Sequence, residues 1–267
     1  MKSNECTERI KKVRRDLNNH DLDALLVTDS FNVRYISGFT GTNGQIFIGK
    51  KNAYLITDFR YLAVAKKILP PSIKLTEMNH GFTATLKKLI EKDGKTSGKV
   101  KAYRLGFEEK NVNYSRWTTL KKQLNKYCSL KPVQGIVEDL RMIKTAEEIR
   151  FITKAQRIAE KVFLEVRKNL KVGKTEQQIA WEIEKFGHEF GADTVSFPAI
   201  VGFRQNSASP HHQNSNRKLK KGDVVLIDMG MMYRGYCSDM TRMIFTQNPP
   251  HSKQKFTTSS SMPRKLP

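Results

Sequence analysis

The chain has 267 residues, of which 48 are Lys or Arg and 26 are Asp or Glu, so its formal net charge is +22. Hydrophobic residues make up 38% of the chain, enough to build a core, which excludes a wholly disordered protein. No apolar run approaches the roughly 20 residues of a membrane span, and the first residues lack the apolar stretch of a signal peptide. Cys6, Cys128 and Cys237 have no paired spacing, so we expect a cytoplasmic protein without a disulfide framework and without a membrane partner.

The excess of basic residues gives a pI near 9.9, which is typical of nucleic-acid-binding proteins. The lysines are spread along the whole chain, however, and few of them alternate with aromatic residues as a base-stacking surface requires. The composition therefore favours solvated basic surfaces over a nucleic-acid site. A non-enzymatic module that binds RNA stays the alternative.

The first 135 residues alternate helix and strand patterns and predict one mixed α/β domain. Two of the strands are separated only by Lys50-Lys51-Asn52, which predicts a hairpin. The expected helices cover 7–17, 61–68, 82–90 and 115–124, and the expected strands cover 24–28, 45–48, 53–57 and 103–107.

A second domain is expected over 136–246, beginning with two helices that carry capping boxes. In the first helix Thr145 and Glu148 form the box, and in the second Thr175 and Gln178 do so. Apolar residues at helical spacing follow each box, and we interpret both stripes as core. The second helix is expected to end near Gly191.

The last part of this domain predicts a β-hairpin with an acidic residue on each strand. The strand Val224–Asp228, a turn over 230–235 and the returning strand Tyr236–Phe245 follow a polar loop. Period-two alternation makes Asp228 and Asp239 candidates to meet across the hairpin.

Two facing carboxylates repel each other, and a divalent metal ion is the simplest way to relieve that repulsion. The residue types allow an equally good alternative, in which Asp228 caps the turn and Asp239 pairs with Arg242. His211 and His212 follow Pro210 in the polar loop; their type alone favours surface histidines, of which at most one can face a given site.

These residues resemble the creatinase/aminopeptidase P family of pita-bread metallopeptidases. Asp228-Met229-Gly230 and the run Tyr236–Arg242 look like its metal-binding hairpin, including the eleven-residue step between the two aspartates. Pro210-His211 matches its substrate-side histidine, seventeen residues before the first aspartate. The resemblance covers about 8–245 and includes further motifs at Asn32–Phe39, Thr57–Tyr61, Leu140–Lys144 and Glu147–Ile149.

The resemblance implies an α+β protein, in which an N-terminal mixed α/β creatinase-like domain precedes the first half of a pita-bread catalytic domain. It implies a metal-dependent Xaa-Pro aminopeptidase, which removes an N-terminal residue that precedes proline. The partner would be a peptide with proline at its second position, and a homodimer is possible in this family. Xaa-Pro dipeptidase and creatinase-type hydrolysis are the alternatives within the same family.

The resemblance also assigns roles to residues. Two divalent metal ions, commonly manganese with cobalt or zinc as options, are bound by Asp228 and bridged by Asp239. His211 is the catalytic and substrate-binding histidine. Thr241 and Arg242 orient the two carboxylates.

The sequence departs from the family pattern after Asp239. The family uses a further His and two Glu as ligands, but this sequence has no Glu after Asp239, and its one later histidine is His251. We therefore expect the chain as written to lack peptidase activity. The composition of residues 247–267 predicts a disordered tail. Codons that could encode the end of this tail, read one nucleotide earlier, can also encode an amphipathic helix, and we interpret this as a sign of a frameshift.

Overall fold

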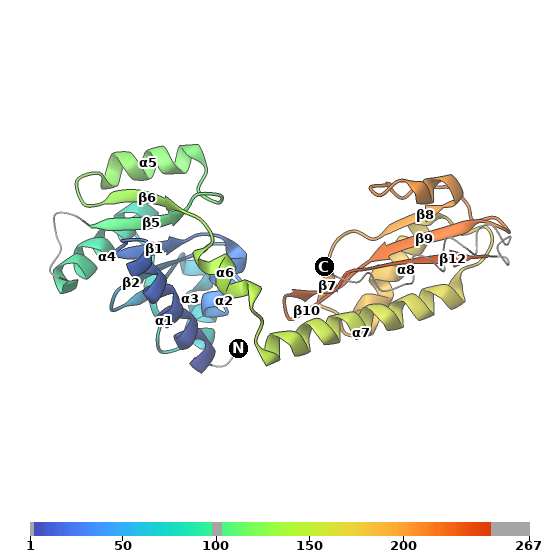
Figure 1. Cartoon of the computed structure of the whole chain (residues 1–267), viewed down its shortest axis with the longest axis horizontal. Helices are drawn as coiled ribbons and strands as arrows, with labels where there is room; N and C mark the ends of the chain where they lie inside the picture. The colour runs from blue at the N-terminus through green and yellow to red at the C-terminus, as the bar shows by residue number, and fades with distance from the viewer. Residues whose placement is uncertain (1–2, 98–102, 247–267) are drawn as a thin grey trace. The chain divides into compact units, whose positions relative to one another are not determined.

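The computed structural model describes residues 3–97 and 103–246, so the predicted tail over 247–267 lies outside the described residues. The chain forms two units, Met1–Ile143 and Lys144–Pro267 (Figure 1). The division falls later than the expected position 135, because helix α6 (Ile136–Met142) buries Ile136 and Val137 in the core of the first unit. Among the described residues, no helix combines the length and apolar character that crossing a bilayer requires.

A six-stranded sheet of order β4-β3-β2-β1-β5-β6 organises the first unit. The predicted hairpin is confirmed as the antiparallel pair β2 and β3, and β2 also pairs antiparallel with β1. The other three pairs are parallel, which makes the sheet mixed. The strands are β1 (Ala24–Val27), β2 (Gly44–Gly49), β3 (Ala53–Thr57), β4 (Lys74–Glu77), β5 (Arg104–Glu108) and β6 (Ser129–Val133).

Helices cover both faces of this sheet because successive strand residues point to opposite sides. Leu25 and Val27 belong to a core that also contains residues of α1, α2 and α6, whereas Ala24 and Leu26 belong to a core with α4 and α5. The helices are α1 (Ser3–Asn19), α2 (Ser30–Ser37), α3 (Leu62–Ile68), α4 (Phe82–Ser97) and α5 (Tyr114–Leu124), with a short 3-10 turn η1 (Phe59–Tyr61) before α3.

Asn32, the first residue of one of the family motifs, connects three elements of the first unit through hydrogen bonds of its side chain. Asn32 is fully buried in α2, and its Nδ2 donates to Glu108 and to Glu138, each at 2.7 Å. Its Oδ1 accepts from Arg141 at 2.8 Å. One amide therefore connects α2, the end of β5 and α6, which is a structural role for this part of the motif.

Two helices and two small sheets build the second unit. Helix α7 (Ala146–Asn169) begins at the capping box of Thr145 and Glu148, and α8 (Glu176–Glu189) begins at the box of Thr175 and Gln178; both boxes are confirmed. The apolar stripes are core as expected, since residues of both helices are buried against the strands.

The strands of the second unit form two three-stranded sheets, ordered β12-β9-β8 and β11-β10-β7. They are β7 (Thr194–Val195), β8 (Ile200–Phe203), β9 (Val224–Met229), β10 (Met231–Tyr233), β11 (Tyr236–Cys237) and β12 (Met240–Phe245), with a 3-10 turn η2 (Arg204–Ala208) after β8.

The predicted single hairpin is wrong in its middle. Residues 231–233 are not part of a turn but form β10, so the tight turn contains only Arg234 and Gly235. The returning strand is also divided, because Ser238 and Asp239 separate β11 from β12. The chain changes sheet twice here, a non-local arrangement that residue alternation does not reveal.

Candidate functional site

Asp228 and Thr241 face each other across two antiparallel strands. The register of β9 and β12 pairs Thr241 with Asp228 and Met240 with Met229. The Thr241 hydroxyl donates to Asp228 Oδ1 at 2.6 Å. Asp228 lies inside β9 and does not cap a turn. The alternative interpretation, in which Asp228 is a turn cap, is therefore wrong for this residue.

Asp239 directly precedes β12, two residues before Thr241. Alternation continued backward from Thr241 predicts that Asp239 lies toward the face of Asp228. Asp239 is exposed, and within residues 3–97 and 103–246 no ion pair joins it to Arg242. Arg242 is also exposed, and its Nη1 donates to the Thr241 carbonyl at 2.8 Å.

The two aspartates flank a point where the backbone passes very close to itself. A Cβ at Gly230 would lie 2.0 Å from the carbonyl oxygen of Ser238, so only glycine fits. The Ser196 hydroxyl donates to that same oxygen at 2.8 Å, and the Met231 amide donates to Ser238 Oγ at 3.0 Å. These contacts fix Ser238, and therefore the residue after it, Asp239, relative to the end of β9.

The other side of this crossing is attached to α7. Tyr236 OH donates to Glu148 Oε1 at 2.8 Å, while Glu148 Oε2 accepts from the Thr145 amide at 2.7 Å. The carboxylate of the capping box therefore has a second function, which is to hold the strand that leads to Asp239.

The two histidines differ sharply in their surroundings. His211 is exposed, as its residue type predicts. His212 is not a surface histidine: its side chain is 15% exposed, and its Nε2 lies 2.7 Å from Glu176 Oε2. His211 is therefore the more accessible of the two histidines.

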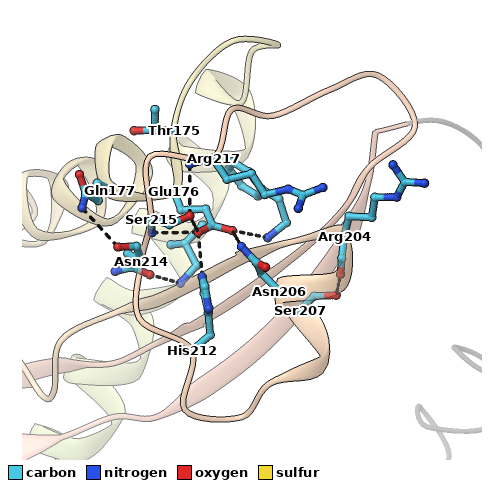
Figure 2. A network of polar contacts seen from close by, with 12 residues as sticks. Thr175, Glu176, Gln177, Arg204, Asn206, Ser207, His212, Asn214, Ser215 and Arg217 are labelled. Carbon is cyan, nitrogen blue, oxygen red and sulfur yellow. Dashed lines mark hydrogen bonds and ion pairs between the residues drawn. The ribbon is translucent and has the colours of Figure 1, made fainter.

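Glu176 accepts hydrogen bonds from four residues of the chain that follows it, although it is fully buried (Figure 2). Oε1 accepts from the Phe203 amide at 2.8 Å and from Asn206 Nδ2 at 2.9 Å. Oε2 accepts from the Ser215 amide at 2.9 Å and its hydroxyl at 2.7 Å, besides the bond with His212.

The pKa of Glu176 is lowered to about 2 by this arrangement. Burial raises the pKa, but the hydrogen bonds to the charged form, first those from His212 and Ser215, lower it by more. Sequence reasoning missed Glu176, because its partners lie 27 to 39 residues away and an acid in the first turn of a helix is common for its own sake.

The acidic pair fits part of a divalent metal site. Carboxylate oxygens suit hard cations such as manganese, the Thr241 hydroxyl engages only one oxygen of Asp228, and Asp239 is exposed. In the part of the chain that the structure describes, no group of three or more His, Cys, Asp or Glu is placed to hold a metal ion. Asp228 and Asp239 would therefore supply two ligands but not a full set.

Comparison with known proteins gives a consistent match along the chain. Residues 150–260 match metallopeptidase family M24, and residues 9–143 match the creatinase/prolidase N-terminal domain. A Bacillus subtilis protein described as a peptidase is 34% identical over 241 residues, which are 90% of this chain and 66% of the relative. The chain thus spans about two thirds of the length of that relative.

Solved structures give the same result. The Xaa-Pro dipeptidase of Bacillus anthracis superimposes with a TM-score of 0.85 at 32% identity, covering 95% of this chain and 68% of that one. The X-Pro aminopeptidase of Thermotoga maritima gives a TM-score of 0.78 at 28% identity, covering 89% and 66%. Similar structures therefore include both a dipeptidase and an aminopeptidase.

Replacing Gly230 with Ala is expected to destabilise the second unit by about 2 kcal/mol or more, because the new methyl group collides with a backbone carbonyl that cannot move freely. Urea unfolding of the variant measures this loss. Gly191→Ala is a control for glycine substitution in general, since its Cβ would meet nothing within 4 Å although its φ of +90° adds local strain. An unfolding free energy equal to that of the parent would contradict the close crossing.

Acid is expected to weaken the second unit through Glu176. Its pKa in the folded state, about 2, lies below the ordinary 4.5, so the stabilisation is present above pH 4.5 and is lost as the pH falls toward 2. The shift corresponds to roughly 3 kcal/mol. Urea unfolding between pH 7 and pH 2.5 should show this loss in the parent and not in Glu176→Gln; parallel pH profiles would show that the carboxylate is not stabilised in this way.

Proposed function

Because the chain belongs to metallopeptidase family M24 and carries a creatinase/prolidase N-terminal domain, we propose that the protein hydrolyses the bond between an N-terminal residue and a following proline. The names of the similar structures support a peptidase that acts at such a bond. The specific activity proposed is that of an Xaa-Pro aminopeptidase, and substrate length separates it from a dipeptidase. A homodimer and a cytoplasmic location belong to the same proposal.

The observation that carries this proposal is the hydrogen bond from the Thr241 hydroxyl to Asp228. Asp239 lies two residues before Thr241 in the sequence. Asp228 and Asp239 would hold divalent metal, with manganese as the first candidate and cobalt or zinc as the others. When bound, such ions supply Lewis-acid activation of water and of the substrate carbonyl.

Thr241, Arg242 and His211 would orient the metal-binding carboxylates and the peptide. The bond from Thr241 fixes one oxygen of Asp228 and thereby directs the other, as partners of metal-binding carboxylates do. Arg242 donates to the carbonyl of Thr241 and would hold that strand position. His211, which is exposed, would donate a hydrogen bond to the peptide carbonyl and stabilise negative charge that develops there.

Metal binding tests the two ligands directly. Asp228→Asn and Asp239→Asn are each expected to lower the affinity for Mn²⁺ at least about tenfold, because a neutral amide replaces a charged ligand. Isothermal titration of the purified chain measures the affinity. Asp193→Asn is the matched control, since Asp193 is an exposed acid of the same unit.

Affinities that are the same in all four proteins would refute the ligand assignment. A loss in only one of the two variants would limit the site to that residue and refute the bridging role given to Asp239.

Peptide cleavage tests the activity and needs the further His and Glu ligands that the family resemblance implies. We expect turnover from a chimera in which this chain is followed by the remaining segment of the Bacillus anthracis relative, and not from the chain alone. With Mn²⁺, an aminopeptidase cleaves Xaa-Pro-Yaa peptides, whereas a dipeptidase cleaves only Xaa-Pro. A mass-spectrometric assay distinguishes the products.

The chimera with Asp239→Asn is the control and should be inactive. A folded, manganese-loaded chimera that cleaves neither substrate, or that cleaves Ala-Ala-Yaa equally well, would contradict the proposed function.

A further inference from the structure

The segment between β8 and β9 divides into two parts according to what holds each part. In residues 214–219, the Leu219 amide donates to the Lys174 carbonyl at 2.8 Å, and Asn214 Oδ1 accepts from the Val201 amide at 2.7 Å. These bonds connect the second part to the start of α8 and to β8. These two bonds do not use the buried carboxylate of Glu176, although Ser215 in the same part also donates to its Oε2 through the amide at 2.9 Å and the hydroxyl at 2.7 Å.

The first part, residues 204–213, depends on that carboxylate. Its side chains Asn206 and His212 both reach Glu176, at 2.9 and 2.7 Å. The backbone bonds within the part only close its own turns, as when the His212 amide donates to the Ser209 carbonyl at 3.2 Å. Among the described residues, the side-chain hydrogen bonds from this part to the rest of the unit therefore end on Glu176 (Figure 2).

His211 lies within this first part, directly before the residue that is bound. The ring of His212 points to the carboxylate, as Figure 2 shows, while His211 is exposed. Because His211 is the residue directly before His212, a bond that holds the His212 side chain also restrains the backbone of His211. No Lys or Arg of the described chain pairs with Glu176, so a buried charge is held here by hydrogen bonds and one histidine alone. Such a charge is costly to bury.

We propose that Glu176 is a positioning residue, whose carboxylate holds residues 204–213 and thereby keeps His211 in place for the peptide. The part of this inference that concerns the peptide rests on the proposed function; the part that concerns the loop rests on the structure alone. A histidine that is already in place binds a substrate without the entropic cost of ordering a mobile loop.

Hydrogen–deuterium exchange tests the loop without any ligand. In Glu176→Gln we expect exchange in peptides from 204–213 to rise about tenfold or more, while peptides from 214–219 change less. Glu184→Gln, an exposed acid on the same helix, is the matched control and should leave both unchanged. Unchanged exchange over 204–213 in a folded Glu176→Gln variant would overturn the proposal.

Variants that each remove a single hydrogen bond to Glu176 provide the test if Glu176→Gln does not fold. Asn206→Ala and His212→Ala each remove one bond to the carboxylate and leave the bonds from Ser215. Each should raise exchange over 204–213 by a smaller factor than the loss of the carboxylate. If neither variant changes exchange there, the segment is held by something other than Glu176, and the proposal fails.

Peptide binding separates positioning from general stability. With Mn²⁺ present, Glu176→Gln should weaken the affinity of the chimera described above for an Xaa-Pro peptide about tenfold. In a His211→Ala background the same change should weaken it less than about twofold, because the residue it positions is gone. Losses that add in the double variant would overturn the positioning role. If the parent chimera binds no such peptide, the proposed function fails, while the exchange experiment still decides whether Glu176 holds the loop.

Discussion

The close passage of the backbone at Gly230 is the constraint on which the acidic pair depends. Strand β9 ends there and the chain enters a different sheet, so close to Ser238 that a Cβ at Gly230 would lie 2.0 Å from its carbonyl oxygen. Asp228 lies two residues before the crossing and Asp239 lies one residue after Ser238. The crossing thus sets the backbone positions of both acids, which are eleven residues apart in the sequence.

Local signals allowed much of the fold to be predicted. Both capping boxes and the hairpin of the first sheet depend on residues within a few positions of one another, and all three are present. Helix α2 was not predicted as a helix, although Asp29 caps its start and Gly38 ends it in the left-handed conformation that glycine favours. The division of the second hairpin between two sheets depends on β7, which is remote in the sequence, and alternation alone could not reveal it.

The candidate site, like the fold, was predictable where it depends on local sequence patterns. Alternation placed Asp228 opposite the strand that carries Thr241, and residue type gave an exposed His211. The role of Glu176 could not be found, because its donors come from the end of β8, from η2 and from the loop that follows, at positions with no regular period. The sequence therefore predicts which groups would meet a metal and a peptide, whereas the groups that hold those residues in place emerge only from the fold.

Paramagnetic broadening by Mn²⁺ tests most directly whether the acidic pair is a metal site. In an ¹⁵N spectrum of the chain, substoichiometric Mn²⁺ should broaden the amide signals of Asp228, Asp239 and Thr241 first, because broadening falls steeply with distance from the ion. Equal amounts of Mg²⁺ provide the diamagnetic reference. Uniform broadening, or broadening centred on other acidic residues, would contradict a metal site at the crossing of these two strands.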